Sequence, residues 1–199
     1  AQAYFYFIEK TGLREKINSM VKSIDTDNIK QLEETAKKIR ELIVAQEMHS
    51  EMREQIIEAY ETLSFPDLSD VSSSDALSIL KTAKELIFVA VRSSATTEDL
   101  SEASFAGQQE TFVNIKGNSE LVEAVKKCFA SLFTARAIYY RAKKGFEHQE
   151  PRIAVIVQKM INSEKSGVIF TNDPVVKSDD IVIEAVFGLG EGIVSGAIK

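Results

Sequence analysis

Apolar residues recur at helical spacing through the first third of the chain. This spacing predicts helices over residues 3–11, 13–24, 28–46 and 51–63. On the second of these, one face carries Leu13, Ile17, Met20 and Val21. Gly12 stands where a glycine commonly ends a helix, after the first predicted segment. Residues 1–64 are therefore predicted to form a mainly helical layer.

Side chains that favour helix termini mark further boundaries. The long helix over 28–46 follows three candidate caps, Asp25, Thr26 and Asp27. Residues 64–75 are rich in Ser, Asp and Pro, which predicts a connecting loop. Ser73 or Ser74 then offers a cap for a short helix that reaches about Leu86.

The pattern changes to short β-rich runs after residue 86. They predict strands over 87–92, 110–115, 152–161, 166–171 and 181–188. One long helix is predicted from about Ser119 to Lys143. The strands around Ile153 and Val168 are joined by too few residues for a helical crossover, so a mainly antiparallel sheet is expected. The predicted class is α+β, an antiparallel sheet with flanking helices.

Composition narrows the function. The chain has 199 residues, 44% of them hydrophobic, and a net charge of −6. This charge argues against a general binder of nucleic acid or of anionic membranes. We find neither a run of eighteen apolar residues nor a basic-then-apolar leader, so a cytoplasmic protein without a membrane span is expected. The single cysteine, Cys128, lies among helix-patterned apolar residues and is interpreted as a packing residue.

A zinc site is not indicated. The only histidines, His49 and His148, are far apart, and neither belongs to a His-x-x-His spacing. The glycine-rich turn "GLGEGIVSG" at 188–196 departs from a dinucleotide fingerprint, because the third glycine position is occupied by Ser195. We interpret this turn as a place where the backbone passes close to another group.

The stretch "VAVRSSATTEDLSEASFAGQQETF", residues 89–112, carries the strongest candidate chemistry. Arg92 at a strand end presents a permanently charged fork of donors that suits phosphate oxygens. Hydroxyls that could assist it come from Ser93, Ser94, Thr96 and Thr97. Gly107 would allow close approach of a ligand to the backbone. The alternative is that these hydroxyls form local turns while Arg92 pairs on the surface with Glu98 or Asp99.

A basic run lies further along the chain, within residues 126–144. It contains no acidic residue and comprises Lys126, Lys127, Arg136, Arg141, Lys143 and Lys144. Two interpretations remain open: a solvated helix face, or a surface that holds a polyanion such as ATP.

Four motifs, in this order, carry a resemblance to a known family. They are "VAVRSSATTEDLSEASFAGQQETF", "CFASLFTARAIYYR", "IAVIVQKMINSEKSGVIFTNDP" and "IEAVFGLGEGIVSGA". Together they resemble the nucleotide-binding domain of the phosphoenolpyruvate-utilising enzymes, a family that includes phosphoenolpyruvate synthase, pyruvate phosphate dikinase and rifampicin phosphotransferase. The resemblance implies an ATP-grasp-like domain over 1–199, with a helical part at 1–64, a first lobe at 86–157 and the start of a second lobe at 158–199.

The resemblance also implies roles for individual residues. Arg92 matches an arginine that contacts the ATP phosphates and serves catalysis, and Gly107 and Thr111 match loop positions around the nucleotide. The remaining matches lie in the segment that meets the adenine edge and, less directly, in the cleft: Gln158, Met160 and Glu184. ATP and Mg²⁺ are the expected cofactors.

The family pattern is incomplete in this chain. The glycine-rich segment with its phosphate-covering lysine, and the acidic ligands of magnesium, are expected outside it. A phosphohistidine domain and a pyruvate-binding domain are expected as partners within a longer chain, and neither His49 nor His148 matches the phosphorylated histidine. Of the family's enzymes, the motifs are most similar to the synthases. Rifampicin phosphotransferase and pyruvate phosphate dikinase are the enzyme alternatives, and a stand-alone nucleotide-binding module is a third reading.

Overall fold

The computed structural model describes residues 1–64, 86–95, 99–100, 103–104, 110–144, 153–173, 175–194 and 196. The chain divides into two compact units, Ala1–Met160 and Ile161–Lys199, which we describe separately. Helices and antiparallel sheets make up the described residues, so the predicted α+β class is confirmed. The predicted short helix with its Ser73 or Ser74 cap, and residues Gly107 and His148, lie outside the described residues.

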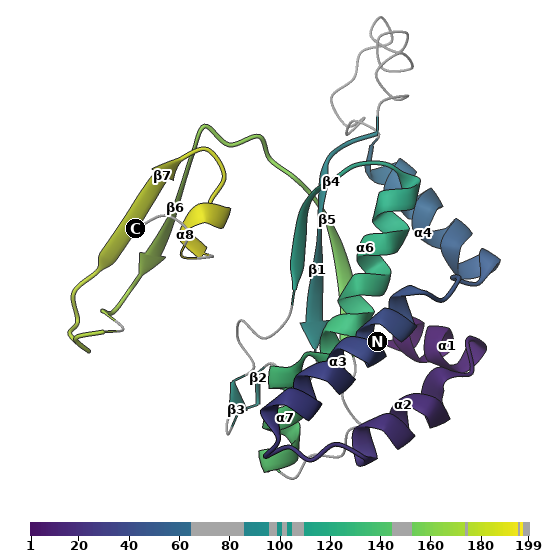
Figure 1. The fold of residues 1–199 in the computed structure, drawn as a ribbon. Helices are drawn as coiled ribbons and strands as arrows, with labels where there is room; N and C mark the ends of the chain where they lie inside the picture. The colour runs from purple at the N-terminus through teal and green to yellow at the C-terminus, as the bar shows by residue number, and fades with distance from the viewer. Residues whose placement is uncertain are drawn as a thin grey trace, which may run out of the picture. The chain divides into compact units, whose positions relative to one another are not determined.

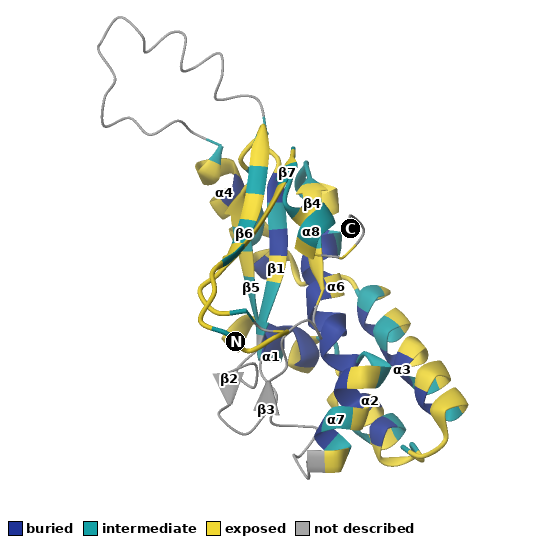
Figure 2. Ribbon diagram, turned by 90° about the vertical axis from the view of Figure 1, so that its left-hand side faces the viewer, coloured by how far each residue is buried: buried dark blue, intermediate teal, exposed yellow. Residues whose placement is uncertain are grey.

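Four helices open the first unit, as predicted. They are α1 (Gln2–Lys10), α2 (Leu13–Lys22), α3 (Ile29–Val44) and α4 (Ser50–Leu63). Gly12 follows α1 with φ of 65°, a left-handed conformation that glycine adopts without the steric cost of a Cβ. One side of α3 is buried and the other faces solvent (Figure 2), because its apolar residues repeat at helical spacing.

The cap of α3 differs from the prediction. Asn28 precedes the helix, and its side-chain oxygen accepts a hydrogen bond from the N–H of Gln31 at 3.1 Å. The carboxylate of Asp25 instead accepts from the N–H of Asp27 at 3.0 Å and forms a turn upstream. Predicting a cap at Asp25, Thr26 or Asp27 was therefore wrong by at least one residue, since these residues belong to the preceding turn.

The single long helix predicted over 119–143 is also wrong. It is broken into α6 (Asn118–Ala130), a 3-10 turn η2 (Ser131–Phe133) and α7 (Ala135–Lys144). Thr134 adopts an extended conformation with ψ of 150°. Its hydroxyl accepts a hydrogen bond from the N–H of Ala137 at 3.2 Å and so caps the new helix. Ser131 helps to end α6 by donating its hydroxyl to the Cys128 carbonyl at 2.7 Å.

A three-stranded antiparallel sheet forms the centre of the first unit. Its order is β4 (Thr111–Ile115), β1 (Val89–Ala95) and β5 (Ile153–Lys159), and a small separate pair comprises β2 (Asp99–Leu100) and β3 (Ala103–Ser104). In the second unit, β6 (Lys165–Phe170) pairs with β7 (Val182–Phe187). The strands around Ile153 and Val168, from which one antiparallel sheet was expected, lie in different sheets. The short connection between β5 and β6 excludes a helical crossover, but it does not require the two strands to pair with each other.

Helix α6 packs against the three-stranded sheet (Figure 1), where the core of the unit lies. Val89 and Val91 of β1 have no exposed surface on this side. Cys128 is likewise fully buried, which confirms its interpretation as a packing residue. The Tyr60 hydroxyl donates to the Ile87 carbonyl at 2.6 Å and accepts from the Gly117 N–H at 3.1 Å, and so ties α4 to both β1 and α6.

The basic run of residues 126–144 fits neither open interpretation as a whole. Lys126 and Arg141 are buried, whereas Lys127 and Lys143 are exposed. The ammonium of Lys126 donates to the carbonyl of Val44 at 2.8 Å, and the guanidinium of Arg141 donates to the carbonyl of Leu132 at 2.6 Å. Burial lowers the pKa of Arg141 to about 10. These two cations therefore satisfy backbone carbonyls inside the fold and belong neither to a solvated face nor to a surface that holds a polyanion.

The glycine-rich turn belongs to the second unit. It follows β7 and leads into a short helix, α8 (Glu191–Val194). Gly188 has φ of 82°, and its carbonyl accepts the Ser166 hydroxyl at 2.6 Å. A Cβ added at Gly190 would lie 3.3 Å from the Cβ of Ser166. The group that this backbone approaches is therefore Ser166 of the neighbouring strand. In the described part of the chain, no helix is long and apolar enough to span a membrane.

Candidate functional site

The face of the β4-β1-β5 sheet opposite α6 carries the candidate site. Successive side chains of a strand point to opposite faces, so Ala90 and Arg92 face away from the buried Val89 and Val91. Arg92 lies on the central strand, opposite Thr111 of β4 on one side and Ile156 of β5 on the other. We call this surface the open face.

Arg92 and Gln158 are in contact on the open face. Gln158 lies opposite Ala90, so it is the diagonal neighbour of Arg92. A guanidinium Nη1 of Arg92 donates to the Gln158 side-chain oxygen at 3.4 Å. The alternative pairing of Arg92 with Glu98 or Asp99 stays open, because Glu98 and the side chain of Asp99 lie outside the described residues.

An irregularity in the sheet positions Met160 at one end of this surface. The register of β1 and β4 shifts between Val89 and Val91, where Asn114 takes a left-handed φ of 58°. The backbone N–H of Asn114 points at the Met160 sulfur, 3.0 Å away. Met160 follows β5, so its side chain reaches across the end of the central strand to β4.

The pairing of β5 with β1 decides which backbone groups a ligand could use. Met160 donates its N–H to the Phe88 carbonyl at 3.0 Å. In an antiparallel ladder, every second residue directs both backbone groups at its partner, so Gln158, opposite Ala90, also faces β1. The intervening Lys159 directs its backbone groups away from β1. The adenine contacts predicted at Gln158 and Met160 stay a prediction, and the outward-facing backbone of Lys159 could not be predicted, because only the register reveals this alternation.

The other predicted residues are distributed differently. Ser93 belongs to β1 rather than to a loop, and its hydroxyl donates to the Glu110 carbonyl at 3.3 Å. Glu184 lies in the second unit, exposed on β7 and opposite Val168. The structure therefore gathers Arg92, Thr111, Gln158 and Met160 in one place, and leaves Gly107 undescribed.

The open face combines a fixed cation with polar and apolar groups. Arg92 can hold an anion, and Thr111 and Gln158 add a hydroxyl and an amide. Beside them, Ile156 and Phe88 are 49% and 50% exposed. Exposed apolar side chains next to an arginine can contact the ring of a ligand that also carries phosphate groups. Within the residues described, no group of three or more His, Cys, Asp or Glu side chains could hold a metal ion.

The comparison with protein families identifies the domain. The family described as "Pyruvate phosphate dikinase, AMP/ATP-binding domain" matches residues 1–199, and the chain belongs to it. The resemblance of the four sequence motifs to this family is thereby confirmed, and with it the nucleotide-binding character of the domain.

Curated relatives extend the comparison. The chain is 50% identical over 198 residues to a probable phosphoenolpyruvate synthase of Archaeoglobus fulgidus, with 100% of this chain and 24% of that protein aligned. Identity is 47% over 200 residues with a probable phosphoenolpyruvate synthase of Methanocaldococcus jannaschii, and the alignment covers 100% of this chain and 16% of that protein. Identity with the phosphoenolpyruvate synthase of Pyrococcus furiosus is 46% over 191 residues, and the alignment covers 96% of this chain and 22% of that protein. The chain thus spans less than a quarter of the length of these relatives.

Proposed function

We propose that the chain binds ATP on the open face, with Arg92 on the phosphates. The observation that carries this proposal is the convergence of Arg92, Thr111 and Gln158 on one solvent-facing sheet surface, in a domain of an AMP/ATP-binding family. Phosphoryl transfer depends mainly on positioning and on positive charge at the transferring group. A guanidinium fixed on a central strand supplies both.

The adenine contacts in this proposal come from the outer edge of β5. Lys159 directs its backbone groups away from β1, whereas those of Gln158 and Met160 face that strand. The Gln158 side chain then borders the ring, whereas the Met160 side chain is directed towards β4, and Met160 remains a proposed contact through the resemblance. Gly107 and Glu184 remain proposed contacts on the strength of the resemblance alone.

We propose that the domain has a fold of the ATP-grasp type. The observed α+β class with antiparallel sheets supports this assignment. Mg²⁺ is part of the proposed chemistry, but the described residues offer no group of ligands for it.

In the longer protein that carries this domain, we propose the reaction of phosphoenolpyruvate synthase. ATP, pyruvate and water would yield phosphoenolpyruvate, AMP and phosphate, with a phosphohistidine on another domain as the intermediate carrier. The names of the relatives favour the synthase over rifampicin phosphotransferase and pyruvate phosphate dikinase. A stand-alone nucleotide-binding module is the alternative from another class.

Titration of ATP into the ¹⁵N-labelled chain tests the binding site. Expected are saturable shifts of resonances from Arg92, Thr111 and Gln158, and an affinity at least about tenfold weaker in Arg92→Ala, the usual cost of removing a charged hydrogen-bonding partner. Arg53→Ala removes an exposed arginine from α4 and should change the affinity less than about twofold. ATP binding that ignores Arg92→Ala would contradict the proposal.

The acceptor is tested with the full-length protein. Beyond one equivalent per enzyme, AMP and phosphate should form from ATP only when pyruvate is present, and rifampicin should not replace pyruvate. Continued formation of AMP with rifampicin and no pyruvate would assign the protein to the phosphotransferase, whereas ATP binding with no AMP formed would favour a stand-alone module.

A further inference from the structure

A hollow of about 440 Å³ lies between α3 and α6, on the helix side of the sheet. Its charged lining includes three cations, Lys37 and Arg40 from α3 and Lys127 from α6. Val44 and Ala130 contribute apolar surface, and Glu110 borders the hollow next to the start of β4. Alternation along the strand places Glu110 and Thr111 on opposite faces of the sheet, so this hollow is separate from the open face.

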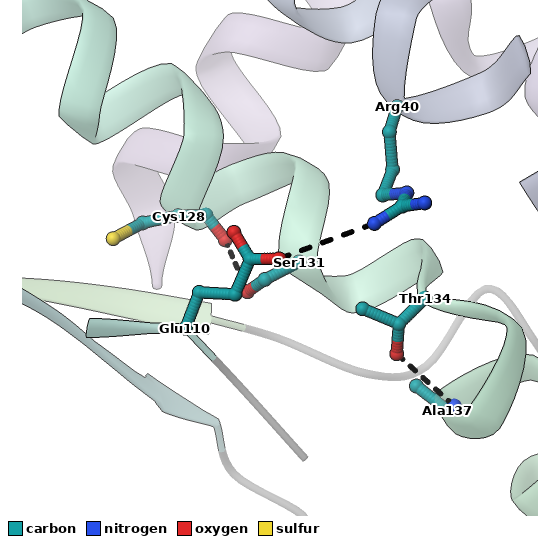
Figure 3. A network of polar contacts seen from close by, with 6 residues as sticks. All are labelled: Arg40, Glu110, Cys128, Ser131, Thr134 and Ala137. Atoms are coloured by element: carbon teal, nitrogen blue, oxygen red, sulfur yellow. Dashed lines mark hydrogen bonds and ion pairs between the residues drawn. The ribbon is translucent and has the colours of Figure 1, made fainter. Parts of the chain in front are cut away.

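Arg40 is incompletely paired here. Its Nη1 atom lies 4.0 Å from a carboxylate oxygen of Glu110, at the outer limit of an ion pair (Figure 3). Its Nε atom is buried and has no hydrogen-bond partner among the residues described. Buried donors in proteins are almost always satisfied, and an exception commonly marks a bound ion or water. The Nε side of the guanidinium therefore needs an acceptor.

The lining also carries an excess of positive charge. Besides the three cations, it includes two carboxylates, those of Glu41 and Glu110, which leaves one net positive charge. Glu41 lies 3.8 Å from Lys37 on the same helix, an exposed pair. Lys127 extends over the Phe112 ring, with 5.8 Å between its ammonium and the ring centroid. Arg40 and Lys127 thus approach the hollow from two different helices.

We propose that this hollow binds an oxyanion, a phosphoryl group in particular, held by Arg40 and Lys127. A phosphoryl group accepts two parallel hydrogen bonds from a guanidinium and so supplies the acceptor that Nε lacks. Lys127 adds a point charge from the opposite wall. Glu110 approaches the Nη1 end of Arg40, so the Nε–H donor is not used by this carboxylate. The apolar surface of Val44 and Ala130 accommodates any small group attached to the phosphate.

Titration with inorganic phosphate at constant ionic strength tests this site in the ¹⁵N-labelled chain. The Nε–H signal of Arg40 and the backbone amides of Lys127 and Ala130 should shift and saturate together. Arg40→Gln should weaken phosphate at the Lys127 and Ala130 amides at least about tenfold, the usual scale for a lost charged donor. Lys38→Gln removes an exposed charge from the same helix outside the hollow and should change affinity less than about twofold.

Two further variants keep the test decisive. Lys127→Gln, read at the Arg40 Nε–H signal, should weaken phosphate about threefold or more, even if Arg40→Gln fails to fold. Arg92→Ala should leave phosphate binding at the hollow unchanged, so that loss of the proposed ATP site is distinguished from loss of this one. Shifts that rise linearly without saturation, that are equal in Lys127→Gln and Lys38→Gln, or that occur only on the open face would overturn the proposal.

Discussion

The ammonium of Lys126 on α6 lies 2.8 Å from the carbonyl oxygen of Val44, the last residue of α3. It also donates to the Gln46 carbonyl at 3.1 Å and lies 2.7 Å from the Glu123 carboxylate. The last carbonyls of a helix have no partner within it, so a lysine from a neighbouring helix satisfies them. One side chain thereby ends α3 and fastens it to α6.

Replacement of this lysine should destabilise the fold. Lys126→Met keeps the length of the apolar stem but leaves two carbonyls of the α3 terminus without a donor, so the free energy of unfolding should fall by about 1–3 kcal/mol. Lys38→Met, an exposed substitution on α3, should change it by less than about 0.5 kcal/mol. Urea unfolding followed by circular dichroism measures both. Equal midpoints for Lys126→Met and wild type would show that water replaces the ammonium without loss.

Arg92 should affect rate more than binding in the full-length protein, if the proposed function holds. Arg92→Ala should slow single-turnover phosphoryl transfer from ATP to the enzyme's histidine by about 10³-fold or more, the typical loss for an arginine that stabilises the transferring group. Arg92→Lys should restore only part of the rate, because an ammonium cannot form the bidentate fork. Arg53→Ala serves as the matched control. A well-folded Arg92→Ala enzyme within threefold of the wild-type rate would remove the support for phosphate contact.

The Tyr60 hydroxyl joins three elements and should matter for stability. Tyr60→Phe leaves the Ile87 carbonyl and the Gly117 N–H without their partner, so we expect a loss of about 1–3 kcal/mol in the free energy of unfolding. Tyr139→Phe removes a hydroxyl from an exposed tyrosine of α7 and should cost less than about 0.5 kcal/mol. Thermal and urea unfolding compare the two variants. Similar losses in both would argue that the Tyr60 hydrogen bonds add nothing net.

Cys128 should make stability depend on alkaline pH. Burial, with a smaller contribution from the Glu110 charge, raises the pKa of the Cys128 thiol from 9.0 to about 12. Between these values the unfolded chain loses this proton and the folded chain keeps it, so the unfolded state is favoured as pH rises. The stability associated with the protonated thiol is fully present below about pH 9 and is lost as pH rises towards 12.

The slope of stability against pH measures this effect. Relative to Cys128→Ala, wild type should lose up to about 1.4 kcal/mol per pH unit above pH 9, the equivalent of one proton. Urea unfolding at pH 8, 9, 10 and 10.5 provides the comparison, and a constant offset from lost packing does not alter the slope. Parallel curves for the two proteins would mean that the thiol titrates alike in both states.

Local patterns predicted the helical layer and most strands, because the spacing of apolar residues shows which face of a helix or strand is buried. The helix break at Thr134 escaped prediction, since Thr134 fits an interior helical position and its cap on Ala137 is a local competition between hydrogen bonds. Strand partners were also missed: β5 pairs with β1, whose paired residues lie 58 to 70 positions earlier in the chain, and not with the nearby β6. Such long-range pairing depends on packing that no short window contains.

The candidate site was predictable in its residue types but not in its geometry. Arg92 was predicted as a cation at a strand end, although β1 continues to Ala95, and its contact with Gln158 depends on the register of two strands. The basic run suggested that Lys126 and Arg141 share one surface with Lys127. Tertiary packing buries Lys126 and Arg141, so charge alone was a poor guide to their exposure. The cations of α3 that line the hollow were not predicted as site residues, because Arg40 and Glu110 are distant in the sequence and come together only in the folded chain.

Neighbouring positions of β1 lie on opposite faces of the sheet, so substitutions at them should affect abundance and activity differently. Val89 and Val91 lie against the core, whereas Ala90 and Arg92 lie on the open face. In a complete substitution scan read separately for abundance and for activity, the odd positions should lower both scores together. The even positions should lower activity while abundance stays near wild type. An alternating phase between the two profiles along four consecutive residues would locate the functional surface of the domain without any bound ligand.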